Sequence, residues 1–170
     1  MKEVDVYTDG ACLGNPGPGG WAFIIKYENG KIDEFHGSEK YTTNNKMELT
    51  AAIKALMYIN EKTKINIYTD SKYLKDGITI WINKWKINGW KTSNKKDVKN
   101  LDLWKLLEKK IKTHEIEWYW VKGHSDNILN EKVDISLIFM WVGSVGLDAQ
   151  ESRSRPPVAE NPCHHGARSC

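Results

Sequence analysis

The sequence predicts an α/β protein in which a five-stranded mixed sheet is flanked by helices. The tetrapeptide at 7–10, Tyr-Thr-Asp-Gly, recurs as Tyr-Thr-Asp-Ser at 68–71, and each copy ends a short run rich in β-branched residues. A helical pattern separates the two runs, and a strand, helix and strand in that order require a right-handed crossover between parallel neighbours. We therefore expect strands 1–3 to be antiparallel and strands 4 and 5 to be parallel.

The first three strands are expected over residues 3–9, 21–27 and 32–40. A segment rich in glycine and proline at 14–20 separates the first two, and Glu28-Asn29-Gly30 separates the second from the third. Connections of this length join neighbouring antiparallel strands, so these residues predict a meander. The segment at 14–20 is not a Walker phosphate loop, because no Gly-Lys-Ser/Thr follows it.

A helix of about four turns is expected next. The tetrapeptide Asn45-Lys46-Met47-Glu48 has the form of a capping box at its start. Apolar residues then recur at the spacing of one helical face, at Leu49, Ala52, Ile53, Leu56 and Ile59. This helix leads into the fourth strand, which is expected over 64–69.

A second helical region is expected over residues 71–87, where Trp81 and Trp85 lie four positions apart. The pattern breaks at 87–90 and resumes over 101–111. We therefore expect two helical segments with an irregular connection between them.

The fifth strand is expected over residues 115–121, where apolar and polar residues alternate strongly. Because side chains alternate between the two faces of a strand, one face carries Ile116, Trp118 and Trp120. This strand completes the predicted sheet.

The composition of the chain changes abruptly after about residue 134. The preceding part is rich in Lys, Asn and Ile, whereas residues 143–170 contain no Lys or Ile and hold every arginine of the chain. These two sets of residues use A/T-rich and G/C-rich codons respectively, so the base composition of the gene is expected to switch as well. We expect one domain over 1–142, with an atypical C-terminal helix from 135, and a disordered tail over 143–170 of foreign or frameshifted origin.

Positive charge is concentrated in one stretch of the chain. The whole chain has a formal charge of +3, yet residues 81–112 contain ten lysines and three acidic residues. A concentrated basic stripe raises encounter rates with polyanions, so nucleic acid or an acidic membrane surface is the expected kind of partner. A solvated lysine face is the alternative.

Cysteine usage and hydropathy indicate the cellular setting. The three cysteines occur at no spacing typical of a disulfide framework, and the N-terminal residues do not form a charged and then apolar leader. The longest apolar stretch, Ile135 to Val142, is shorter than the roughly 20 residues that a membrane span needs. We expect a monomer in the reducing cytoplasm that does not cross a membrane.

Four acidic residues are candidates for a metal site: Asp9, Glu48, Asp70 and Asp134. Each has an ordinary explanation, as a turn residue for Asp9, a helix cap for Asp70, a capping-box residue for Glu48 and an exposed helical residue for Asp134. Carboxylates that converge at one edge of a sheet raise one another's pKa unless cations neutralise them. Hard divalent ions with oxygen ligands suit such a set, so the sequence predicts a site for Mg²⁺, with Mn²⁺ as a substitute.

The expected chemistry of such a site is phosphodiester hydrolysis. Two divalent ions about 4 Å apart activate a water on one side of the phosphodiester and stabilise the leaving oxygen on the other. His124 follows the last strand, and we interpret it as a proton-handling residue, with an unremarkable loop histidine as the alternative. A glycosidase with paired carboxylates is disfavoured, because the basic, tryptophan-rich stretch would then have no purpose.

Tryptophans and lysines alternate in the basic stretch. Trp81 and Trp104 have an ordinary explanation as residues that pack helices, whereas Trp85 and Trp90 lie among lysines around a glycine break. These features predict a protruding basic element that binds phosphates and stacks on sugars or bases. The candidate contact residues are Trp81, Lys84, Trp85, Lys86, Trp90, Lys91, Lys95 and Lys96.

Several motifs occur together in one order: YTDGACLGNPGPGG at 7–20, TTNNKMEL at 42–49, TDS at 69–71, GWKT at 89–92, VKNLDLW at 98–104, WVKGHS at 120–125 and NEKVD at 130–134. With these motifs, residues 4–134 resemble the type 1 ribonuclease H family in its bacterial form with a basic protrusion. The resemblance implies a ribonuclease H-like fold and endonucleolytic cleavage of the RNA strand of RNA–DNA hybrids by two metal ions, leaving 5′-phosphate and 3′-hydroxyl ends.

The resemblance also implies roles for individual residues. The four acidic residues named above match the family's metal-binding carboxylates, and His124 matches a residue that moves protons or helps product leave. Thr43 matches the pocket for a phosphate of the DNA strand, and Lys72 stands at a groove position where many relatives carry glutamine. The positions that meet the minor groove of the hybrid are matched by Asn15, Asn44 and Asn45.

The resemblance ends at Asp134. Relatives continue with a helix of small residues, whereas this chain continues with the bulkier apolar sequence ISLIFMW at 135–141. The alternative function is therefore a hybrid-binding module whose catalysis is impaired by the altered C-terminus.

Overall fold

The structure is a computed structural model, and it describes residues 1–122. The predictions for His124, Asp134, the atypical C-terminal segment and the tail over 143–170 lie outside the described residues. Within residues 1–122, no helix is long and apolar enough to cross a membrane.

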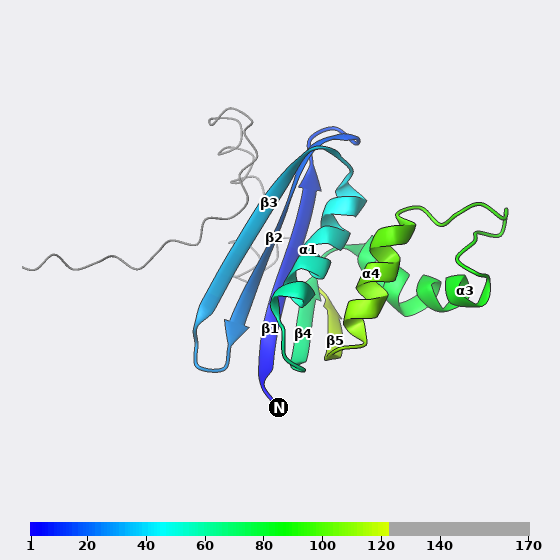
Figure 1. The fold of residues 1–170 in the computed structure, drawn as a ribbon. Helices are drawn as coiled ribbons and strands as arrows, with labels where there is room; N and C mark the ends of the chain where they lie inside the picture. The colour runs from blue at the N-terminus through cyan, green and yellow to red at the C-terminus, as the bar shows by residue number, and fades with distance from the viewer. Residues whose placement is uncertain (123–170) are drawn as a thin grey trace, which may run out of the picture.

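A five-stranded sheet forms the centre of the molecule, with the strand order β3-β2-β1-β4-β5 (Figure 1). Both β1–β2 and β2–β3 pair antiparallel, whereas β1–β4 and β4–β5 pair parallel, which confirms the predicted mixed sheet. The strands are β1 Glu3–Cys12, β2 Gly17–Tyr27, β3 Ile32–Thr42, β4 Lys64–Thr69 and β5 Glu115–Trp120.

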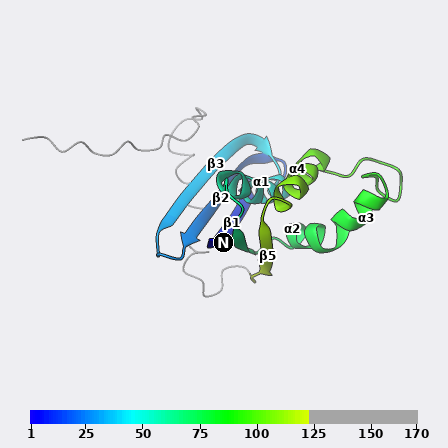
Figure 2. The same ribbon diagram turned by 60° about the horizontal axis from the view of Figure 1, so that its bottom comes forward.

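Two helices cover one face of this sheet, and a further helical segment extends away from it. In Figures 1 and 2, α1 and α4 lie against the sheet, whereas α3 and the loop after it project beyond the edge formed by β5. The helical elements are α1 Asn44–Tyr58, α2 Lys72–Asp76, the π-helical turn η1 Gly77–Trp81, α3 Ile82–Ile87 and α4 Leu101–Ile111.

The strand β2 begins four residues earlier than predicted. The glycines that indicated a loop instead pair with both neighbours, with Gly19 opposite Cys12 of β1 and Glu39 of β3. A Cβ on Gly19 would lie well inside 3.0 Å of the Thr42 side chain. Glycine is therefore needed here for close strand packing rather than for a turn.

The single helix predicted over 71–87 is divided in the structure by the π-helical turn η1. Gly77 begins this turn, and its backbone lies so close to the ring of Trp104 that a Cβ would overlap the ring. Helical periodicity over 71–87 did not indicate this contact, because Trp104 comes from α4, far along the chain.

The main core lies between the sheet and the helices α1 and α4. Alternate residues of β1 and β4 face this core, because successive side chains of a strand point to opposite faces. Among the buried residues on this face are Val4, Val6, Ile65 and Ile67. From the helices, the fully buried side chains in this core include Leu49, Ala52, Leu56, Trp104 and Leu107. This core holds β1, β4 and α1, the three elements that lead to the candidate site.

The opposite face of the sheet carries a row of tyrosines. The ring centroids of Tyr7 and Tyr68 lie 4.8 Å apart and those of Tyr68 and Tyr119 lie 5.0 Å apart, with the rings stacked across β1, β4 and β5. Tyr7 is buried together with Ala22 and Ile24 of β2. Cross-strand aromatic pairs of this kind stabilise the register of neighbouring strands.

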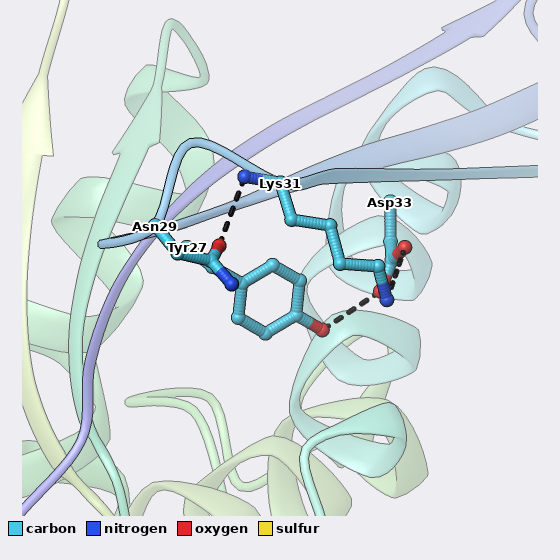
Figure 3. A network of polar contacts seen from close by, with 4 residues as sticks. All are labelled: Tyr27, Asn29, Lys31 and Asp33. Carbon is cyan, nitrogen blue, oxygen red and sulfur yellow. Dashed lines mark hydrogen bonds and ion pairs between the residues drawn. The ribbon is translucent and has the colours of Figure 1, made fainter.

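Polar contacts fix the hairpin between β2 and β3 (Figure 3). The Tyr27 hydroxyl donates to Asp33 at 2.9 Å, and the Lys31 ammonium pairs with the same carboxylate at 3.1 Å. The Lys31 backbone N–H donates to the Asn29 side chain at 3.0 Å. Burial and the hydrogen bond to Asp33 raise the pKa of Tyr27 to about 12, so this network keeps the tyrosine protonated.

A half-buried histidine between α4 and β5 makes the stability of the fold sensitive to acid. Burial lowers the pKa of His114 below its ordinary value, because the neutral ring is favoured in the folded state. Its contribution to stability is therefore fully present above the unfolded pKa of about 6.5 and is lost as the pH falls below that value.

We expect His114 to contribute a fall in the free energy of unfolding between pH 7 and pH 5, by no more than about 1.4 kcal/mol per pH unit for this one proton, which appears as the difference between wild-type and variant profiles. Urea unfolding of the wild type and of His114→Gln at a series of pH values measures the effect, and the variant should have the flatter profile. His36→Gln, which replaces an exposed histidine on β3, is the control. Equal slopes for the wild type and His114→Gln would contradict the assignment.

Candidate active site

Three carboxylates gather at one edge of the sheet: Asp9 on β1, Glu48 on α1 and Asp70 directly after β4. One oxygen of each lies within 4.8 Å of the others. The parallel register pairs Tyr7 with Tyr68, so the aspartates two positions later lie at the same level, Asp9 still within β1 and Asp70 directly after β4. The structure thus brings together three of the four predicted carboxylates, and Asp134 lies outside the described residues with His124.

The start of α1 determines where Glu48 lies. Thr43 is the N-cap of the helix, and its hydroxyl accepts a hydrogen bond from the Lys46 backbone N–H at 3.3 Å. The predicted capping box beginning at Asn45 is wrong, because the cap position lies two residues earlier and Glu48 is beyond the first turn. The ordinary explanation for Glu48 therefore does not apply.

A glycine allows β1 and α1 to approach each other at the site. A Cβ on Gly10 would lie well inside 3.0 Å of the backbone at Met47 and Glu48. The Gly10 backbone N–H also donates to the Asp9 carboxylate at 2.9 Å. The absence of a side chain at position 10 thus places Glu48 against the residue that follows Asp9.

Glu48 lies in an electrostatically costly environment. Its side chain is 5% exposed, and its Oε2 atom has no hydrogen-bond partner within the described part of the chain. Burial, and then the charges of Asp9 and Asp70, raise the pKa of Glu48 well above its ordinary value, although the Gly10 backbone N–H opposes the shift. A buried carboxylate with one unpartnered oxygen beside two other carboxylates fits a divalent cation, which would compensate both the lost hydration and the repulsion.

Asp70 occupies a two-residue link between β4 and α2. Ser71, not Asp70, caps α2, because its hydroxyl accepts from the Leu74 backbone N–H at 3.1 Å. The Ser71 N–H in turn donates to the Thr69 hydroxyl at 3.1 Å. The Asp70 carboxylate is therefore not needed for capping and is exposed at the sheet edge.

Trp120 was not among the residues predicted for the site. In the structure, its indole N–H donates to the backbone carbonyl of Asp70 at 3.2 Å. The signal that would have identified this contact is the parallel register of β4 and β5, which sets Trp120 opposite Thr69. That register depends on pairing between distant segments, which alternation within one strand does not define.

Two of the predicted minor-groove residues meet at the start of α1, the helix that carries Glu48. The Asn44 backbone N–H donates to the Asn15 side-chain oxygen at 3.1 Å, which ties the glycine-rich loop to the start of α1. Asn45 lies in the same helical turn and is half-buried. Lys72, the first residue of α2, is exposed beside the Asp70 link.

The predicted basic element contains one aromatic cluster. The ring centroid of Trp85 lies 5.8 Å from that of Trp81, 6.3 Å from that of Trp90 and 5.4 Å from that of Trp104. Trp104 is fully buried, and the other three are half-buried. Trp81, Trp85 and Trp90 therefore each pack in the cluster and are also partly exposed. The expected division, with Trp81 as a packing residue and Trp85 and Trp90 as exposed residues, is not seen.

The lysines of this element differ in their partners. Lys86 pairs with Glu108 at 2.9 Å, and Lys91 pairs with Asp97. In contrast, no ion pair within residues 1–122 engages Lys84, Lys95 or Lys96. The charge of these three lysines is therefore available to a polyanion.

Known proteins resemble this chain in both sequence and structure. The RNase H family model matches residues 1–136. The Ribonuclease H of Wolbachia sp. subsp. Drosophila simulans (strain wRi) is 59% identical over 133 residues, covering 78% of this chain and 91% of the relative. The Ribonuclease H of Ehrlichia ruminantium (strain Gardel) is 55% identical over 135 residues, covering 79% and 92% respectively.

Among solved structures, LC9-RNase H1, described as a type 1 RNase H with the type 2 active-site motif, has a TM-score of 0.73 and 32% sequence identity, and the match covers 85% of this chain and 74% of that one. The foamy viral protease-reverse transcriptase in complex with an RNA/DNA hybrid has a TM-score of 0.65 at 19% identity, covering 78% and 19%, and shows the fold alone. Taken with the family match and the identities above, the chain belongs to the ribonuclease H family, as its motifs indicated, and is an enzyme of the endoribonuclease class.

Proposed function

We propose that this enzyme hydrolyses the RNA strand of RNA–DNA hybrids at internal positions, using two Mg²⁺ ions and leaving 5′-phosphate and 3′-hydroxyl ends. One observation carries the proposal: Glu48, buried and with an unpartnered oxygen, lies within 4.8 Å of the carboxylates of Asp9 and Asp70. Family membership supports the same substrate class.

The carboxylates Asp9, Glu48 and Asp70 would hold the divalent ions, with Asp134 proposed as a further ligand. When bound there, Mg²⁺ or Mn²⁺ supplies Lewis-acid activation of a water and stabilises charge on the leaving oxygen. Burial holds the Glu48 carboxylate in one position and limits its hydration, which favours binding to a cation. His124 is proposed to move a proton or to assist product release.

Polar groups beside the carboxylates are proposed to select the hybrid. The hydrogen bond between Asn15 and Asn44 uses the Asn15 side-chain oxygen and the Asn44 backbone N–H. The side-chain NH₂ group of Asn15 and the whole side chain of Asn44 remain to meet the minor groove. Asn45 and Lys72 are proposed to contact the same groove, where the 2′-hydroxyl distinguishes RNA from DNA. Thr43 accepts a hydrogen bond from Lys46, and its hydroxyl proton remains to donate to a phosphate of the DNA strand.

Analysis of the product ends tests the proposed chemistry. A hybrid with a 5′-labelled RNA strand is incubated with Mg²⁺, and the fragments are offered to a polymerase that extends only 3′-hydroxyl ends. The 3′ end of the starting RNA strand is blocked, so that the uncleaved strand cannot be extended. We expect the polymerase to extend every cleavage fragment that carries the 5′ label. Fragments that end in a 2′,3′-cyclic phosphate would exclude water as the nucleophile.

The basic stretch over residues 81–112, in which α3 and the loop after it project from the sheet, is proposed to bind phosphates through Lys84, Lys86, Lys91, Lys95 and Lys96 together with the half-buried tryptophans. Replacing Lys84, Lys95 and Lys96 with alanine should weaken hybrid binding and flatten its salt dependence, by up to about one unit of slope for each lost phosphate contact. Binding is measured in chelator, so that no cleavage occurs, at several salt concentrations.

The matched control removes three lysines that are paired with carboxylates elsewhere: Lys2 with Glu61, Lys31 with Asp33 and Lys62 with Glu115. Both variants lose the same formal charge. An equal change of slope in the two would show that net charge alone acts, and the 81–112 stretch would then be a solvated lysine face.

The alternative, a hybrid-binding module with impaired catalysis, finds no support within residues 1–122, where the site carboxylates converge. We further propose that the catalytic domain occupies residues 1–142 and that residues 143–170 form a separate tail of foreign or frameshifted origin. The family match, which ends at residue 136, supports this division.

A further inference from the structure

Trp120 lies beside the segment that carries Asp70, yet it is poorly buried. It is the last residue of β5, stands opposite Thr69 of β4 and donates its indole N–H to the Asp70 carbonyl at 3.2 Å. Its side chain is 46% exposed. Burial of apolar surface therefore explains the orientation of this ring less well than it does for the partly buried Trp118.

The ring of Trp120 is also held from the side of α2. The Lys75 ammonium lies over it, 5.2 Å from the ring centroid. A cation in this position is attracted to the face of an indole. The ring therefore connects three elements: β5, which carries it, the link after β4, which accepts its hydrogen bond, and α2, which provides the lysine.

Asp70 depends on its backbone for its position. Within residues 1–122 its exposed carboxylate accepts no side-chain hydrogen bond that would orient it. The peptide before Asp70 is held by its Thr69 carbonyl, which accepts from the Val121 N–H at 3.0 Å. In the peptide after Asp70, the Ser71 N–H donates to the Thr69 hydroxyl and the Asp70 carbonyl accepts from Trp120, so the indole is one of the two hydrogen-bond partners that hold this peptide.

We propose that Trp120 is a positioning residue for Asp70, whose indole N–H holds the Asp70 peptide so that the carboxylate stays with those of Asp9 and Glu48. The inference rests on the proposed metal-dependent function. A ligand set must be held to within about 0.5 Å of its productive geometry, and rotation of one peptide is enough to exceed that tolerance. Losing the indole donor therefore weakens the binding of divalent ions before it affects the fold.

The test compares Trp120→Phe with Trp118→Phe. The first variant keeps an aromatic ring under Lys75 and removes the donor, whereas the second reduces packing two residues earlier on the same strand face. Calorimetric titration with Mg²⁺ or Mn²⁺, without substrate, measures divalent affinity. Hydrogen exchange of the Ser71 and Leu74 amides reports on the link.

For Trp120→Phe we expect divalent affinity to fall by about two- to tenfold, the range of one lost hydrogen bond. Amide exchange in the link should become faster, and hybrid affinity in chelator should stay unchanged. Cleavage should slow at limiting Mg²⁺ and recover at saturating Mg²⁺. Trp118→Phe should lower thermal stability and leave divalent affinity unchanged.

A second substitution keeps the test decisive if Trp120→Phe is unstable. Trp120→His retains a ring N–H and should recover part of the divalent affinity that Trp120→Phe loses. If the wild type binds no divalent ion, the proposed function itself fails. The positioning role is wrong if the wild type binds divalent ions and all three variants bind them as tightly as the wild type does. It is also wrong if Trp118→Phe loses as much divalent affinity as Trp120→Phe.

Discussion

Asp70→Asn should abolish cleavage and leave hybrid binding in chelator almost unchanged. The substitution removes the charge of one of three carboxylates whose oxygens lie within 4.8 Å of one another. Replacing even an outer partner of a metal ligand commonly costs 10- to 100-fold, so the loss of a ligand charge should exceed about 100-fold in rate. The fold should be retained, because Ser71 rather than Asp70 caps α2.

The same substitution should stabilise the metal-free protein, although it abolishes cleavage. Burial, and then the charges of Asp9 and Asp70, raise the pKa of Glu48. A carboxyl group whose pKa is higher in the folded state destabilises the folded protein as the pH rises through that pKa. Removing the Asp70 charge should therefore make the metal-free protein slightly more stable at neutral pH. Single-turnover cleavage in Mg²⁺ and thermal unfolding in chelator measure the two effects.

Asp76→Asn is the matched control, since Asp76 ends α2 six residues along the chain. It should retain cleavage. Near-full activity of Asp70→Asn would remove this residue from the proposed metal site, and a large loss of stability would mean that the carboxylate has a structural role instead.

Gly10→Ala should damage both the fold and the site. The added methyl group would lie well inside 3.0 Å of backbone atoms of Met47 and Glu48, which do not rotate away as a flexible side chain does. We expect α1 to be displaced from β1, at a cost of about 1–3 kcal/mol in unfolding free energy. Because Glu48 moves with α1, divalent affinity and cleavage should fall as well.

Gly30→Ala separates this effect from a general cost of replacing glycine. Gly30 has a positive φ of 82° in the β2–β3 turn, and no atom lies within 4 Å of the position of its Cβ. Alanine there should cost about 1 kcal/mol through backbone strain and leave cleavage unchanged. Urea unfolding and cleavage rates of both variants decide the matter, and wild-type behaviour of Gly10→Ala would mean that the close contact between β1 and α1 is not required.

Patterns within single elements predicted most of the fold. Recurrence of the Tyr-Thr-Asp sequence within β1 and at the end of β4 predicted the parallel pair, although β1 continues to Cys12, and helical spacing predicted α1 and α4. The convergence of Asp9 and Asp70 followed from the parallel pairing, because parallel strands present their carboxyl ends at one edge.

Features that depend on contacts between distant segments were not predicted. Gly19 was assigned to a loop, although it packs against Thr42, and the π-helical turn begins at Gly77, which packs against Trp104. The local pattern at Asn45–Glu48 suggested a capping box, yet the actual cap is Thr43. In each case the contact that determines the structure comes from a residue outside the local sequence pattern.

The electrostatic character of the site also required the structure. A carboxylate in a sequence gives no indication of its burial, whereas Glu48 is almost completely buried and has an oxygen without a partner in the described chain. The hydrogen bond from Trp120 to Asp70 depends on the register of β4 and β5, which strand alternation does not determine.

One measurement tests the central claim most directly: cleavage of a single labelled RNA strand that is presented alone, in an RNA duplex and in an RNA–DNA hybrid, with Mg²⁺ and then with chelator. The proposed function predicts cleavage of the RNA in the hybrid at many internal positions, an intact DNA strand, little cleavage of the other two forms and complete arrest by chelator. Equal cleavage of the RNA duplex and the hybrid, or cleavage that continues in chelator, would contradict it.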